Sequence, residues 1–289
     1  MSTDKFQESR QTKPKSKTLV KVHVQQQPER IPTLNLLQSD QSLLTTNQWT
    51  LLSNLCNCYN ESNMILWSQR LIDKYDILQS NYVSFTALIE EHLESIYETA
   101  GAYLRFNDDL RHLSSDDRSI MLRSAADNVS CMSGAFIMQY CNLYGLDTYL
   151  KAMNVKYGQR TVDLTTRTRK FIDPDVVLVK LSISLFAFSE NSCCYYSNLL
   201  DDLTNPIHIL EIQNKYADVT WKYLLYKYGH YDAMKRFLNL ILWLSSMNVL
   251  AVHGQSVTTH VKDLDSIIKQ TELTLKLNEV EEIIETSQQ

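Results

Sequence analysis

Pairs of aspartates are the residues whose type and spacing could bind metal ions in this sequence. The segment Asp201-Asp202-Leu-Thr-Asn205 fits a relaxed form of DDxxD, whose carboxylates hold the Mg²⁺ ions of a bound diphosphate. Pro206 follows at once, which places the motif at a helix start rather than along a helix wall. Asp108-Asp109 and Asp116-Asp117 lack a third ligand, and helix-starting acids explain Asp116-Asp117 better.

Cysteine and histidine show no arrangement that indicates catalysis. The six cysteines contain no CxxC pair and the seven histidines are scattered, so neither a zinc ligand set nor a nucleophile with its base is indicated. Neither GxGxxG nor GxxxxGK[ST] occurs, which leaves no glycine-rich phosphate loop. We predict that the chain is not an enzyme, has no catalytic residues, and uses no metal or cofactor.

The composition favours helices over sheets. Glycine (6) and proline (5) each make up about 2% of the 289 residues, against ordinary levels of about 7% and 5%. Sheet sandwiches and barrels need these residues in turns at short intervals, and 44% apolar residues allow a sizeable core. The net charge of −5 provides no basic surface for nucleic acid. We expect an all-α protein.

The first part of the chain differs from the rest. Residues 1–45 are polar and include the basic run Lys13-Pro-Lys15-Ser-Lys17. We interpret them as a disordered basic and polar arm, hinge-like, before a folded domain at residues 46–289. The most apolar window, residues 237–252, is interrupted by asparagine and serine, and we predict a buried helix there rather than a membrane span.

The folded part contains signals for eight to eleven helices. Apolar residues at three- and four-residue spacing form a stripe over residues 85–104, and Ser114 begins a second, nearly all-apolar helix. Asp173-Pro174-Asp175 predicts a cap, a first helical position and a first-turn acid.

Later signals complete this outline. Asn205-Pro206 predicts another helix start, Gly229 a helix end, and residues 275–285 a last acidic amphipathic helix. Residues 143–172, with two glycines and a Thr/Arg run, predict loops with at most a short β-hairpin.

Four segments occur in an order and at spacings that match one known family. They are residues 110–123, 181–190, 209–216 and 236–248. They resemble, respectively, the helix 3–4 region, helix 8, helix 9 and helices 10–11 of nuclear receptor ligand-binding domains. In the first segment Leu113, Asp117 and Leu122-Arg123 follow the family pattern, while Arg118 stands where the family prefers Gln.

The resemblance implies a fold and a function. Such domains are three-layer antiparallel helical sandwiches that bury a lipophilic ligand, and their last helix completes a groove for coactivator helices carrying LxxLL. On this basis Arg105 and Arg123 are the expected basic residues of the groove. Glu282, or less suitably Glu279, is the expected acidic residue of the last helix.

The same resemblance places a ligand pocket. Its expected lining is Leu93, Ile96, Tyr97, Ala100, Val129, Met132, Ser133, Phe136 and His253. Plain core packing explains most of these residues as well. Because residues 143–172 are short for a hairpin and two helices, we expect a small, collapsed or open pocket.

The expected partners follow from the family resemblance and from one feature in which this sequence differs from the family. The zinc DNA-binding module of such receptors needs cysteines, and the first 50 residues contain none, so we expect no direct DNA binding by this chain. We expect a nuclear, ligand-responsive transcription regulator that binds a lipophilic small molecule and LxxLL coregulators and acts as a homodimer or a heterodimer with a retinoid X-type receptor. The cytoplasm is a second location, and no membrane is involved. The alternatives are a non-catalytic helical adaptor and, with less support, an isoprenoid-synthase-like enzyme.

Overall fold

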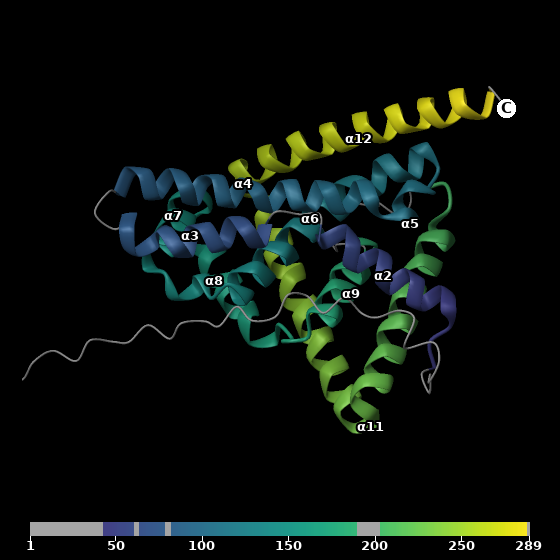
Figure 1. Cartoon of the computed structure of the whole chain (residues 1–289), viewed down its shortest axis with the longest axis horizontal. Coiled ribbons are helices and arrows are strands. Elements are labelled where there is room, and N and C mark those ends of the chain that lie inside the picture. The colour runs from purple at the N-terminus through teal and green to yellow at the C-terminus, as the bar shows by residue number, and fades with distance from the viewer. Residues whose placement is uncertain (1–42, 61–63, 79–81, 190–202, 288–289) are drawn as a thin grey trace, which may run out of the picture. The chain divides into compact units, whose positions relative to one another are not determined.

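The computed structural model describes residues 43–60, 64–78, 82–189 and 203–287, and every regular element in these ranges is a helix (Figure 1). The expected all-α class is thereby confirmed. The longer helices are α2 Thr46–Asn60, α3 Met64–Leu78, α4 Tyr82–Phe106, α6 Ser115–Tyr140, α7 Asp147–Tyr157, α8 Gln159–Thr168, α9 Val176–Ala187, α11 Pro206–Gly254 and α12 Thr258–Ser287. The short elements are α5 Asp108–Arg111, η1 Leu143–Gly145 and η2 Arg169–Phe171. Residues 1–42 of the expected arm lie outside the described residues.

Helix α6 lies at the centre of the fold. It packs against α4, α9, α11 and α12, and its buried residues occur all round the helix, as the apolar run predicted. The stripe on α4 is likewise buried, with Ile89 and Ala100 wholly inaccessible. Helices α3 and α12 pack on α4, and α9 lies between α6 and α11.

Helix starts follow the capping residues that the sequence offers. Ser114 accepts a hydrogen bond from the Asp117 amide at the start of α6, and Asn205 accepts one from the His208 amide at the start of α11. These two starts confirm the predictions. They also assign Asn205 to a cap rather than to metal binding, whereas Asp201 and Asp202 lie outside the described residues.

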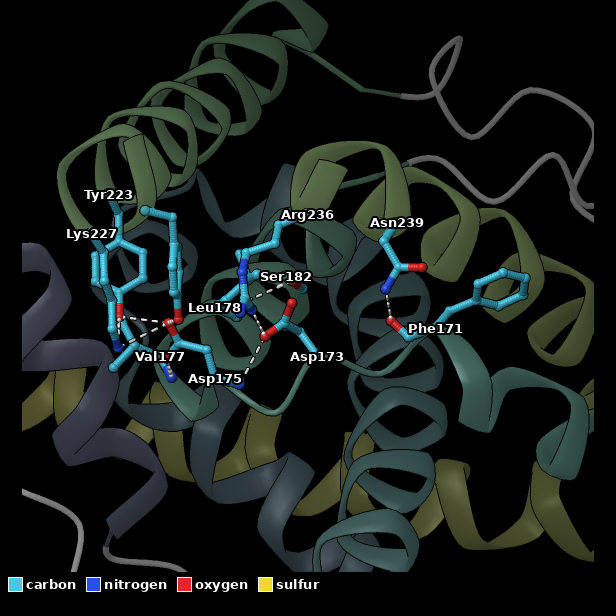
Figure 2. A network of polar contacts seen from close by, with 11 residues as sticks. Phe171, Asp173, Asp175, Val177, Leu178, Ser182, Tyr223, Lys227, Arg236 and Asn239 are labelled. Carbon is cyan, nitrogen blue, oxygen red and sulfur yellow. Dashed lines mark hydrogen bonds and ion pairs between the residues drawn. The ribbon is translucent and has the colours of Figure 1, made fainter. Parts of the chain in front are cut away.

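The predicted start of α9 was wrong by two residues. Asp175, not Asp173, is the cap and accepts from the Val177 amide. Asp173 instead accepts from the Asp175 amide and pairs with Arg236 of α11 (Figure 2). The tertiary contact with Arg236 therefore holds the chain in a turn at Asp173 and delays the helix.

The loops and hairpin predicted for residues 143–172 were also wrong, because this region forms η1, α7, α8 and η2. Gly158, at φ 86°, makes a single-residue break between α7 and α8. The threonines of α8 satisfy their hydroxyls locally: Thr161 and Thr165 donate to carbonyl oxygens four residues earlier. With these hydroxyls paired, the Thr-rich run can bury one face of a helix.

Helix α11 is bent at Gly229, the residue predicted to end a helix. Gly229 has φ 70° and ψ 173°, values that are not helical and that favour glycine. Figure 1 shows the resulting sharp angle between the two arms of α11. Among the described residues, α11 is the one helix whose length and composition would allow it to cross a membrane. In this structure α11 packs on α6, α8 and α9.

A polar network joins the start of α9 to both arms of α11 (Figure 2). The buried Asp175 carboxylate accepts from Tyr223 at 2.9 Å, Tyr228 at 2.7 Å and Lys227 at 3.1 Å. Burial alone would raise the pKa of Asp175, but the hydrogen bonds from the two tyrosines and the charge of Lys227 lower it. This anion therefore stays charged and fixes the bend of α11 on the core.

Candidate functional site

A cavity of about 70 Å³ lies between six helices of the domain and is partly open to its surface. Its lining comes from α4 (Leu93, Ile96, Tyr97), α6 (Ser130, Cys131, Gly134, Met138), α7 (Tyr149, Met153, Tyr157), α8 (Thr161, Thr165), α11 (Leu250, Gly254), the turn residue Val257, and His260 of α12. These lining side chains include no lysine, arginine, aspartate or glutamate. The cavity can therefore accept an uncharged, largely apolar molecule.

The structure places the expected pocket residues in two groups. Leu93, Ile96 and Tyr97 line the cavity. The others do not: Ala100, Val129, Met132, Ser133 and Phe136 are buried in the core around it, and His253 is half-buried on α11. Each residue of a helix is turned by about 100° from the last, so on α6 the cavity face falls on Ser130, Cys131, Gly134 and Met138. The pocket residues expected on α6 from the family resemblance are shifted by about one position along the helix, and they therefore lie on a neighbouring face.

His253, expected near a ligand hydroxyl, has other surroundings. Its Nδ1 lies 3.4 Å from the Ser256 hydroxyl, and its Nε2 has no hydrogen-bond partner. Burial, then the nearby charges of Arg160 and His260, lower its pKa. The histidine that lines the cavity is His260, at the beginning of α12.

A hydrogen-bonded chain of polar side chains crosses one wall of the cavity. The Tyr97 hydroxyl lies 2.7 Å from His260 Nδ1, and His260 Nε2 lies 2.9 Å from an Asp127 oxygen. Gln255 donates to the other Asp127 oxygen at 3.1 Å, and the Cys131 thiol donates to the first at 3.5 Å. This chain ties the first turn of α12 to α4 and α6.

Two hydroxyls in the cavity wall, those of Ser130 and Tyr149, have no hydrogen-bond partner and are fully buried. A buried hydroxyl without a partner costs free energy that a bound ligand or water can recover. Sequence reasoning missed both residues. Neither residue has a distinctive neighbourhood in the sequence, and only the tertiary structure shows that their hydroxyls are unpaired.

The two arginines expected in a coregulator groove lie on either side of α12. Arg123 of α6 pairs with Asp265 of α12 at 3.0 Å. A Cβ atom at Gly101 of α4 would lie 3.0 Å from Ile267 and 3.1 Å from the Arg105 guanidinium, so α12 passes close beside Arg105. Burial lowers the pKa of Arg105. Figure 1 shows α12 lying along α4.

Helix α12 is longer than the predicted last helix. It begins at Thr258 and continues through the expected segment 275–285, with Leu264, Ile267 and Ile268 buried against the domain. The spacing of these three residues, Leu-x-x-Ile-Ile, is that of an LxxLL helix. Glu282 and Glu279 belong to α12, but their side chains lie outside the described residues.

A scan against protein-family models finds no match for this chain, and a search of curated proteins finds no similar sequence.

Proposed function

We propose that this chain is a nuclear-receptor-like domain that regulates transcription in response to a lipophilic small molecule. It recruits coregulators through LxxLL helices, works in the nucleus as a dimer, and reaches DNA only through a partner. The helical adaptor, without cavity or ligand, is the alternative.

The order of the helices supports this proposal. Helices α3, α4 and α12 form one side, α6 and α9 the middle, and the arms of α11 with α8 the other side. This grouping supports the three-layer sandwich that the proposal requires. The four segments that carry the resemblance fall on α5–α6, α9, and the two arms of α11.

The observation that carries the proposal is a largely apolar cavity bordered by the start of the last helix. His260 and Val257 form part of the wall, so a molecule that enters must contact the segment that begins α12. Drug-sized ligands occupy pockets of about 300–1,000 Å³, well above 70 Å³. On this proposal α7 or α12 therefore moves outward when a larger lipophilic ligand binds, which would couple ligand binding to the position of α12.

The position of α12 also explains how the groove would be controlled. Its segment Leu264 to Ile268 covers the surface between Arg105 and Arg123, where an LxxLL helix would bind. A coregulator must compete with this segment, and any ligand that loosens α12 lowers the cost of that competition.

Competition between α12 and a coregulator peptide can be measured directly. We expect a fluorescent LxxLL peptide to bind the wild-type chain weakly, and to bind the variant Ile268→Ser at least ~10-fold more tightly because α12 packs less well. Adding Arg105→Glu to Ile268→Ser should reverse the gain, because the cation near the carbonyl end of the peptide helix is lost. Fluorescence anisotropy provides the readout.

Two controls make the result specific. Lys151→Glu reverses an exposed charge on α7, away from the groove, and should leave peptide binding unchanged. A lipid extract should raise the affinity of the wild-type chain, and Ser130→Phe, which fills the cavity, should remove that effect. If the peptide binds neither the wild type nor Ile268→Ser, the adaptor becomes the better description.

A further inference from the structure

Two side chains of the cavity wall, Cys131 and His260, lie with the neighbouring Asp127 and together offer the donor atoms of a metal site. Asp127 and Cys131 are four residues apart on α6 and share one face of it, and His260 approaches them from α12. One oxygen, one sulfur and one nitrogen from these residues lie within 4.8 Å of one another. The side chains of Asp127 and His260 are only 4% and 8% exposed. No motif in the sequence predicts this cluster, because His260 lies far from α6 along the chain.

The distances are close to those that zinc requires. Tetrahedral ligands at usual Zn²⁺ bond lengths have their O and N atoms about 3.3 Å apart and their O and S atoms about 3.5 Å apart. Here the Asp127 oxygen lies 2.9 Å from His260 Nε2 and 3.5 Å from Cys131 Sγ. A shift of a few tenths of an ångström at His260 would open the carboxylate–imidazole contact enough for the ion.

The outer contacts of a metal site are already in place. His260 Nδ1 is held by the Tyr97 hydroxyl at 2.7 Å, and the second Asp127 oxygen accepts from Gln255 at 3.1 Å. Such bonds orient the ligands of metal sites. The imidazole of His260 can occupy this position because residue 254 is glycine: a Cβ atom there would lie 2.9 Å from His260 Nε2.

Charge gives a reason for a cation at this place. The Asp127 carboxylate is buried, and the donors that contact it are the side chains of His260, Cys131 and Gln255. A buried carboxylate is costly unless a positive charge compensates it. Either a proton on His260 or a bound metal ion would supply the positive charge that compensates Asp127. Zn²⁺ is a metal ion that binds oxygen, nitrogen and sulfur donors together.

We propose that Asp127, Cys131 and His260 bind one Zn²⁺ ion, with the fourth position open to the cavity. On binding, the Cys131 thiol releases its proton to solvent. In neutral His260 the ring proton moves from Nε2 to Nδ1, where it is donated to the Tyr97 hydroxyl. The ion then fastens the first turn of α12 to α6 and presents an open position to a ligand donor atom. This site does not depend on the proposed regulatory function.

Cobalt(II), a spectroscopic substitute for zinc, tests this site in the full chain. We expect one Co²⁺ per chain, with a thiolate-to-cobalt charge-transfer band in the near ultraviolet that Zn²⁺ abolishes. Zinc in excess should raise the melting temperature by ~5 °C. Cys131→Ser should remove the band, and His260→Gln should weaken Co²⁺ binding at least ~10-fold.

The control is Cys141→Ser, which removes another half-buried thiol, at the C-cap of α6, and should keep the band. Circular dichroism of each variant checks that it folds. Absence of the band in the wild type, or its persistence in Cys131→Ser, would overturn the proposal and leave the His260–Asp127 contact as a hydrogen bond or ion pair only.

Discussion

At the scale of single residues, burial decides the protonation of the histidine on α4. His92 is 1% exposed, and neither of its ring nitrogens has a hydrogen-bond partner. Its ring packs 5.6 Å from that of Tyr149, centre to centre. Burial lowers the pKa of His92 from 6.5 to about 4, so the imidazole remains neutral in the folded protein at mildly acidic pH.

A neutral His92 makes stability depend on pH. Below pH 6.5 the unfolded chain takes up a proton at this residue while the folded chain does not. The free energy of unfolding therefore decreases as the pH is lowered from 6.5 to about 4. Between pH 7 and pH 5 we expect His92 to remove about 2 kcal/mol. Urea denaturation of His92→Phe should lack this loss. His208→Gln, at an exposed histidine side chain, should retain it, and equal pH dependence in wild type and His92→Phe would contradict the assignment.

At the scale of the elements, the fold depends on close approach between α4 and α12. Gly101 faces α12, and a Cβ there would lie 3.0 Å from Ile267 and 3.1 Å from Arg105. Gly134 of α6 has more space, with the nearest side-chain atom of Ile96 3.6 Å from such a Cβ. The two glycines thus differ in the space around them: a Cβ would be crowded at Gly101 but would make an ordinary van der Waals contact at Gly134.

A larger residue at Gly101 should release α12. We expect Gly101→Leu to raise the hydrogen-exchange rate of the amides around Leu264 and Ile268 at least ~10-fold, because α12 loses its packing on α4. Gly134→Ala replaces a glycine inside α6 by a better helix-forming residue and should leave hydrogen exchange in α12 unchanged. Protection of α12 that survives Gly101→Leu would show that other contacts hold this helix.

At the scale of the whole molecule, the second arm of α11 presents an apolar stripe to solvent. The stripe consists of Tyr231, Met234, Leu238, Ile241, Leu242 and Val249, each at least 44% exposed. Their spacing follows one helix face, as in helices that pair with another helix. Under the proposed dimer, a second copy of the same stripe would cover it across a two-fold axis. Arg236 of the same arm does not contribute to this stripe, because it pairs with Asp173.

Disruption of the stripe should dissociate the proposed dimer. We expect the wild-type chain to be dimeric by light scattering at micromolar concentration, and Leu238→Arg with Ile241→Glu to be monomeric, since two charges replace buried apolar contacts. Val155→Arg alters an apolar side chain that is 87% exposed on α7 and should remain dimeric. A wild-type monomer that pairs only with a retinoid X-type receptor domain would exclude the homodimer.

The sequence by itself determined the helical class, the stripe of α4, the buried character of α6, and the helix starts at Ser114 and Asn205. These features depend on local spacing and capping groups, which residues close along the chain supply. The tertiary structure alone decided the cap at Asp175, the helices of residues 143–172, and the position of α12. It also brought His260 to Asp127 and left Ser130 and Tyr149 unpaired, because contacts between distant helices choose which face of each helix meets the cavity.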